Sequence, residues 1–226
     1  MRTRAVRTAA LLGAVGVLTL SGCSLRPGVG LAVGDETVSN DRIDALTASV
    51  CEIQEPQLSA QQQVIPLSLL KANVASTLLN REITEQAAAA YDVEPDETYQ
   101  QSVEQTRQQV PVADEGELAD YVELLTTQAY TESIITAIGV AEAGPGATEE
   151  EAQQAGADAF TAFVADTDIE VDPRYGFSYD GATISGTEGA SSVAASERAL
   201  LAADVTDPTG VAEYAASLPP DQTCGG

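Results

Sequence analysis

Apolar residues in the middle of the chain recur at spacings of three and four, the pattern of helices that bury one face. This pattern predicts helices over residues 39–50, 66–91, 96–110, 117–138 and 149–163. Ser39 and Thr148 are residue types that cap helix N-termini, and Pro66 fits a first helical turn. The Gln-rich stretch 52–65 is predicted to be a loop with some helical tendency, and Gly139 is expected just past the end of its helix.

Short strand patterns flank this helical region. Residues 31–33 and 37–38 are separated by Gly34, Asp35 and Glu36, which predicts a β-hairpin. Residues 168–172 alternate between polar and apolar and predict a further strand. Residues 177–226 are rich in Ala, Ser, Thr and Gly and predict a poorly structured tail with one short helix between Val193 and Ala202. The fold class is therefore mainly α, with a small β element.

The N-terminus carries the pattern of an export signal. Three arginines precede an apolar run over residues 9–20, which is too short to span a bilayer. The sequence Leu20-Ser21-Gly22-Cys23 then resembles the cleavage site of bacterial lipoproteins. That resemblance implies removal of residues 1–22, a lipid on the Cys23 thiol, a linker over residues 23–30, and anchoring to the outer face of the bacterial cell membrane. An ordinary signal peptide or a short uncleaved anchor is the alternative.

The chain is strongly acidic, with 35 acidic and 10 basic residues and a net charge of −25. Removing residues 1–22 leaves seven basic against 35 acidic residues, a net charge of −28. Such a surface repels nucleic acid and anionic headgroups, so we expect no nucleic-acid partner and membrane attachment through acyl chains alone. The favoured interpretation of this charge is that it keeps the protein soluble. The second interpretation is a preference for cationic or unfolded partners.

Catalytic motifs are missing from the sequence. The chain contains no histidine, which excludes Ser-His-Asp and Cys-His catalysis and His-based zinc sites. The only lysine of the chain, Lys71, is expected to point to solvent from a helix. Four acidic residues alternate along the late strand: Asp166, Asp168, Glu170 and Asp172. Alternate carboxylates could bind calcium, but the run lacks the pattern of an EF-hand loop. A solvated strand face is therefore the better interpretation. We expect no enzyme activity, no metal and no cofactor.

Two cysteines remain besides Cys23. In an exported protein, Cys51 and Cys224 are expected to form a disulfide that closes a loop of roughly 170 residues. Free thiols or a metal site are the alternatives.

The order of elements resembles a known family of exported chaperones. The run Leu31-Ala-Val-Gly-Asp-Glu-Thr-Val-Ser39, with the helix through Asp41 to Leu46, is similar to the opening of SurA-like and PrsA-like proteins. The helix end at residues 82–97 resembles a junction in the same family. The segment Val171-Asp-Pro-Arg-Tyr-Gly176 resembles a segment near the end of actinobacterial lipoproteins that have a SurA N-terminal domain. The likeness covers roughly residues 31–176, which we expect to be one helical domain.

The resemblance implies that the strand at Ile169 and Val171 pairs beside the hairpin at Leu31 and Val33, and that the helices enclose an apolar cleft for unfolded chains. We expect no parvulin prolyl-isomerase domain, because the site of such a domain contains histidine and this sequence has none. The expected function is therefore a non-catalytic, chaperone-like holdase for unfolded or newly exported polypeptides. The apolar residues Leu70, Val74 and Leu78 could line the cleft or form buried core. A docking lipoprotein with one envelope partner is the alternative, and a carboxylate-dependent hydrolase comes third.

Overall fold

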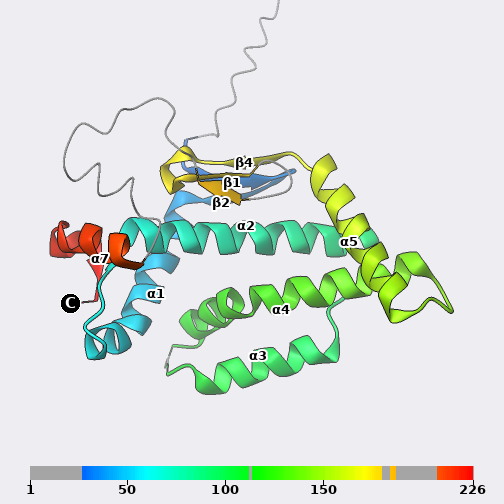
Figure 1. Ribbon diagram of the computed structural model, residues 1–226, viewed down its shortest axis with the longest axis horizontal. Helices are drawn as coiled ribbons and strands as arrows, with labels where there is room; N and C mark the ends of the chain where they lie inside the picture. Colours follow the sequence, from blue (N-terminus) through cyan, green and yellow to red (C-terminus); the bar gives the residue numbers. More distant parts are fainter. Residues whose placement is uncertain (1–26, 112–113, 180–183, 187–207, 226) are drawn as a thin grey trace, which may run out of the picture.

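The computed structural model describes residues 27–111, 114–179, 184–186 and 208–225. The chain is mainly helical with a small antiparallel sheet, as the sequence pattern predicts. The helices are α1 (Asn40–Ala60), α2 (Leu67–Tyr91), α3 (Glu97–Gln109), α4 (Glu115–Ala143), α5 (Glu149–Asp166) and α7 (Pro208–Ala216). In Figure 1, α2 crosses the molecule with the sheet on one side and α3 and α4 on the other.

The main sheet joins the two ends of the helical region. It contains β1 (Val29–Val33), β2 (Glu36–Ser39) and β4 (Ile169–Val171) in the order β2-β1-β4, with antiparallel neighbours. Leu31 lies opposite Val171, and Val33 lies opposite Ile169. The predicted hairpin and the predicted pairing of the late strand are both confirmed. Leu31 and Val33 are buried, and the side-chain amide of Gln86 in α2 donates a hydrogen bond of 2.6 Å to the Val33 carbonyl.

Helix α1 is longer than the sequence pattern predicts. The Ser39 hydroxyl accepts a hydrogen bond of 3.1 Å from the Arg42 backbone N–H, so the predicted N-cap is confirmed. The prediction of a loop was wrong for residues 52–60, because the helix continues to Ala60 with Pro56 inside it. Burial of Leu58 against the core favours the extra turns, although Pro56 removes one helical hydrogen bond. Sequence periodicity missed this because only Leu58 is buried in the last two turns.

The backbones of α4 and α5 approach each other closely at two glycines, Gly139 and Gly156. A Cβ atom added to Gly139 would lie 2.1 Å from the Ala152 carbonyl oxygen, and one on Gly156 would lie 2.2 Å from that of Ile135. The expectation that Gly139 follows the helix end was wrong, since α4 runs on to Ala143. The glycine permits close backbone packing instead. Thr148 caps α5 as predicted, in a reciprocal capping box with Glu151.

The core has two parts. The larger lies between the sheet, α1 and α2, and the smaller lies between α2 and α4 around Ala87, Ile134 and Ile138. Helix α3 lies outermost and contributes no fully buried residue.

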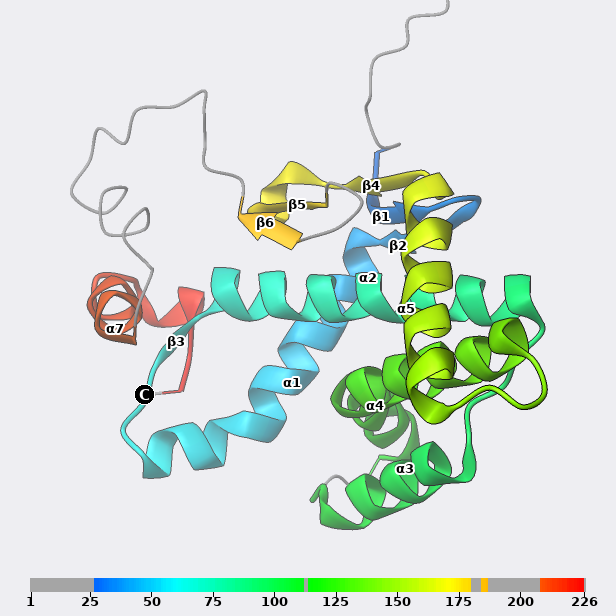
Figure 2. The same cartoon turned by 45° about the vertical axis from the view of Figure 1, so that its right-hand side comes forward.

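The end of the chain returns to the beginning of α2. Strand β7 (Thr223–Cys224) pairs with β3 (Ile65–Pro66), while β5 (Phe177–Tyr179) and β6 (Ile184–Gly186) form a separate hairpin. In Figures 1 and 2, α7 lies near β3 at the N-terminal end of α2. Residues 1–26, which include Cys23, and the predicted helix between Val193 and Ala202 lie outside the described residues.

Candidate functional site

Cys51 and Cys224 hold the C-terminal segment against α1. Their sulfur atoms lie 2.11 Å apart and their Cα atoms 5.6 Å apart, as in a disulfide. Cys224 is fully buried in the larger core cluster. On the neighbouring strand, Ile65 pairs directly with Cys224 in the two-stranded ribbon. The disulfide and the ribbon together place η2 (Pro220–Gln222) and α7 beside the loop that connects α1 with α2.

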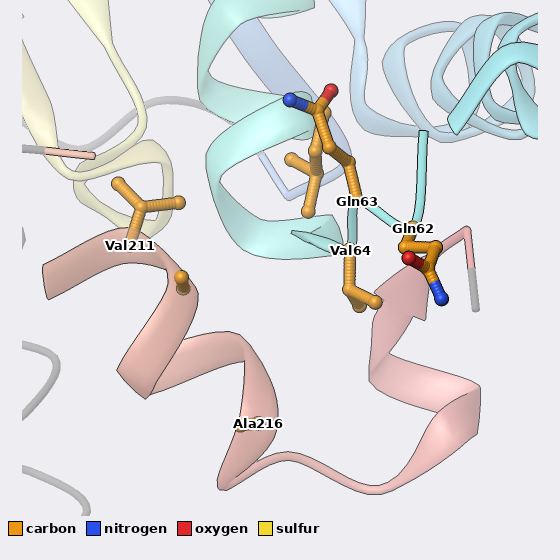
Figure 3. Close-up of a pocket in the computed structure, with 7 residues that line it drawn as sticks. Gln62, Gln63, Val64, Val211 and Ala216 are labelled. Carbon is orange, nitrogen blue, oxygen red and sulfur yellow. The ribbon is translucent and has the colours of Figure 1, made fainter. Parts of the chain in front are cut away.

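A hollow lies between this loop and α7, and we call it the C-terminal pocket. Its volume is about 580 Å³, and its walls are residues 62–65 on one side and Val211, Ala212 and Ala216 on the other. In Figure 3, the Val64 side chain projects into the space between the loop and the C-terminal segment. The described residues that line the pocket include no charged side chain. The pocket therefore suits an uncharged, apolar group.

A second hollow of about 360 Å³ lies near Tyr214 and Leu218 of the C-terminal segment. It is lined by Lys71 and Arg174, but both cations have carboxylate partners. Lys71 Nζ lies 2.6 Å from Asp44 Oδ1, and Arg174 Nε lies 2.8 Å from Asp172 Oδ2. Lys71, expected to point to solvent, is thus half-buried in an ion pair. Because Asp221 also lines this hollow, it offers no excess positive charge to an anion.

The three candidate binding residues on α2 are buried in the core. The exposed fractions of Leu70, Val74 and Leu78 are 6 %, 4 % and 8 %. Of the two interpretations that the sequence left open, core packing describes these side chains, and they do not line an open cleft.

A groove between α2 and α4 is largely polar. It has a volume of about 620 Å³, and most of its lining side chains carry hydroxyl or amide groups, with Leu124 and Leu125 among them. Leu125 and Val140 are the only large hydrophobic residues classed as exposed in the described part of the chain, at 51 % and 62 %. The described surface thus contains isolated apolar positions rather than one continuous apolar cleft.

The acidic run near β4 contributes to local structure. The Asp172 carboxylate accepts a hydrogen bond of 3.0 Å from the Arg174 backbone N–H and caps η1 (Pro173–Tyr175). Within the described residues, no three acidic or cysteine side chains are grouped closely enough to hold a metal ion.

A charged and aromatic cluster between α2, α3 and α4 is not visible in the sequence pattern. The Arg81 guanidinium lies 3.8 Å from the centre of the Tyr130 ring and donates hydrogen bonds to the Tyr99 hydroxyl at 3.2 Å and to Glu85 at 2.6 Å. Burial raises the pKa of the nearby Glu123 carboxyl, and the charge of Arg81 offsets only part of that rise. Arg81, Tyr99 and Tyr130 lie on three different helices, so only the helix packing reveals their contact.

The buried hydroxyl of Tyr175 donates a hydrogen bond to the Asn40 side chain, which connects η1 with the first residue of α1. Burial, with the negative charge of Asp44 as a smaller cause, raises the pKa of Tyr175 to about 12. This pair reinforces the junction between the sheet and α1.

Comparisons of the chain with protein-family models, with curated proteins and with solved structures gave no match. None of the described helices is long and apolar enough to cross a membrane.

Proposed function

We propose that the chain is a lipid-anchored, non-catalytic protein of the bacterial cell envelope that binds unfolded or newly exported polypeptides as a chaperone-like holdase. The observation that carries the proposal is the pairing of β4 with β1, with Leu31 opposite Val171. The strand that follows the long helices thus pairs beside the N-terminal hairpin. The resemblance to SurA-like proteins implies the same pairing.

Export and anchoring rest on the Leu20-Ser21-Gly22-Cys23 motif. The approach of Cys51 to Cys224 supports the same compartment, because disulfides persist in oxidising surroundings outside the cytosol. The net charge of −28 after removal of residues 1–22 keeps the protein soluble and away from anionic lipid.

A docking lipoprotein with one dedicated envelope partner is the second candidate. The observation in its favour is the scarcity of exposed large apolar residues in the described part of the chain, where Leu125 and Val140 stand alone. A holdase that covers long unfolded segments benefits from a wider apolar surface, whereas a single partner needs only a few matched contacts.

An aggregation assay separates the two candidates. Residues 24–226, which contain every described element, would be purified in oxidising buffer and mixed in equal amounts with a chemically unfolded exported protein. Suppression of light scattering beyond that of an equally acidic unrelated protein is the result expected of a holdase. Scattering equal to that control contradicts the holdase and leaves the docking protein, to be pursued by pull-down from the native envelope.

A further inference from the structure

We infer that the C-terminal pocket receives an apolar side chain of an extended polypeptide whose flanking residues are basic. This inference rests on the proposed polypeptide-binding function and names the surface and the sequence class that it would recognise. The pocket has a volume of about 580 Å³, within the usual range for ligand sites.

The lining offers two kinds of contact that a peptide can use. Val64, Ile65 and Val211 provide apolar walls, and the amides of Gln62 and Gln63 can both donate and accept hydrogen bonds. A peptide backbone offers one hydrogen-bond donor and one acceptor beside each side chain, and both can pair with a glutamine amide. The pocket therefore combines burial for one apolar side chain with polar partners for the adjoining backbone.

The hollow exists because two small residues face it. Ala212 and Ala216 are one turn apart on α7 and both are exposed, whereas Ala215 is 3 % exposed and forms the contact between α7 and the rest of the protein. A larger side chain at position 216 would enter the pocket without disturbing the buried contact at Ala215. The site can thus be blocked selectively.

The charge around the pocket favours basic flanking residues. Residues 52–66 and 208–225, the two segments that surround it, contain no basic residue and, apart from Asp221 of the second hollow, three acidic ones: Glu52, Glu55 and Glu213. Lys71 and Arg174 line the other hollow and are paired with Asp44 and Asp172. A polypeptide with arginine or lysine beside its apolar residue is attracted by this surface, and an acidic one is repelled.

The test measures peptide binding by fluorescence anisotropy with residues 24–226. The probe is a short labelled peptide with the centre Leu-Val-Leu and arginines at both ends; its companions replace the centre by Ser-Thr-Ser or the arginines by glutamates. Ala216→Leu fills the pocket, and Ala162→Leu adds the same side chain at an exposed position of α5. We expect Ala216→Leu to raise the Kd about tenfold or more and Ala162→Leu to leave it unchanged.

Each outcome bears on the inference. Weaker binding of both companion peptides by the parent chain supports the apolar and basic specificity. Equal binding by the parent chain and Ala216→Leu overturns the pocket as the site but leaves the proposed function intact. No binding of the peptide, together with no suppression of aggregation, overturns both. If the parent chain self-associates and Ala216→Leu abolishes only that association, the occupant is a second copy and the inference is wrong.

A second variant, Val64→Thr, keeps the shape of the wall while making it polar, and we expect it to weaken binding too.

Discussion

The Arg81 guanidinium lies 3.8 Å from the centre of the Tyr130 ring, so a cation from α2 packs on an aromatic face of α4. Tyr99 of α3 completes the contact, with its ring centre 5.2 Å from that of Tyr130 and its hydroxyl accepting a hydrogen bond from Arg81. Since α3 contributes no fully buried residue, we expect this cluster to help attach α3 to the rest of the fold.

Replacing Arg81 should loosen that attachment. Arg81→Met retains much of the apolar stem but removes the cation–π contact and the hydrogen bonds to Tyr99 and Glu85. We expect the free energy of unfolding to fall by about 1–2 kcal/mol, measured by urea denaturation. Arg107→Met, an exposed change on α3, is the matched control. Equal midpoints for the two variants would show that the cluster contributes little.

Glu123 should make stability depend on pH. Burial raises the pKa of its carboxyl in the folded protein above the ordinary value of 4.5, so folding favours the protonated form. The associated stability is present below pH 4.5 and is lost as the pH rises through the raised pKa. Glu123→Gln should therefore be more stable than the parent chain at pH 7 and equal to it near pH 3. Urea titrations at both pH values measure this, with Glu142→Gln, an exposed change on the same helix, as control. A Glu123→Gln advantage that is the same at both pH values would contradict the argument.

The crossing of α4 and α5 should tolerate no side chain at Gly139. A Cβ atom there would meet the Ala152 carbonyl oxygen at 2.1 Å, and backbone cannot rotate away as a side chain can. We expect Gly139→Ala to destabilise the protein by about 2 kcal/mol or more, despite the better helix propensity of alanine. Gly116→Ala in the first turn of α4 meets only the Asp114 side chain, at 3.3 Å, and should be far milder. Thermal unfolding followed by circular dichroism compares them; similar melting temperatures would mean that the helices can separate at little cost.

The sequence predicted most of the fold because its helices carry regular apolar spacing and recognisable caps. Ser39 and Thr148 mark helix starts through hydrogen bonds within four residues, and such local interactions can be read from a single sequence. The role of Gly139 could not be read in this way, because the constraint comes from Ala152 on another helix. The second half of α1 was missed for a similar reason, since Leu58 is buried by elements distant in the chain.

The candidate site was less predictable than the fold. Ala212 and Ala216 have no chemical signature, and they matter only because α7 is held against residues 62–65. The cysteines gave a usable signal for the position of this segment, because two leftover cysteines in an exported chain favour pairing. The apolar residues of α2 gave an ambiguous one, because helical spacing is the same for a core face and for a binding groove.

The C-terminal pocket should depend on the link between Cys51 and Cys224. A loop of 173 residues separates the two cysteines, and the chain-entropy model gives such a link up to about 5 kcal/mol of stabilisation. Without it, the short β3–β7 pairing and the packing of α7 against β3 remain among the contacts of this segment. In Cys51→Ser we therefore expect faster cleavage by chymotrypsin after Tyr214, weaker binding of the Leu-Val-Leu peptide and a lower melting temperature. The double variant Cys51→Ser/Cys224→Ser controls for reactions of the leftover thiol. Equal protection of Tyr214 in the parent chain and in both variants would show that residues 208–225 stay docked without the link, and that the pocket is built by packing alone.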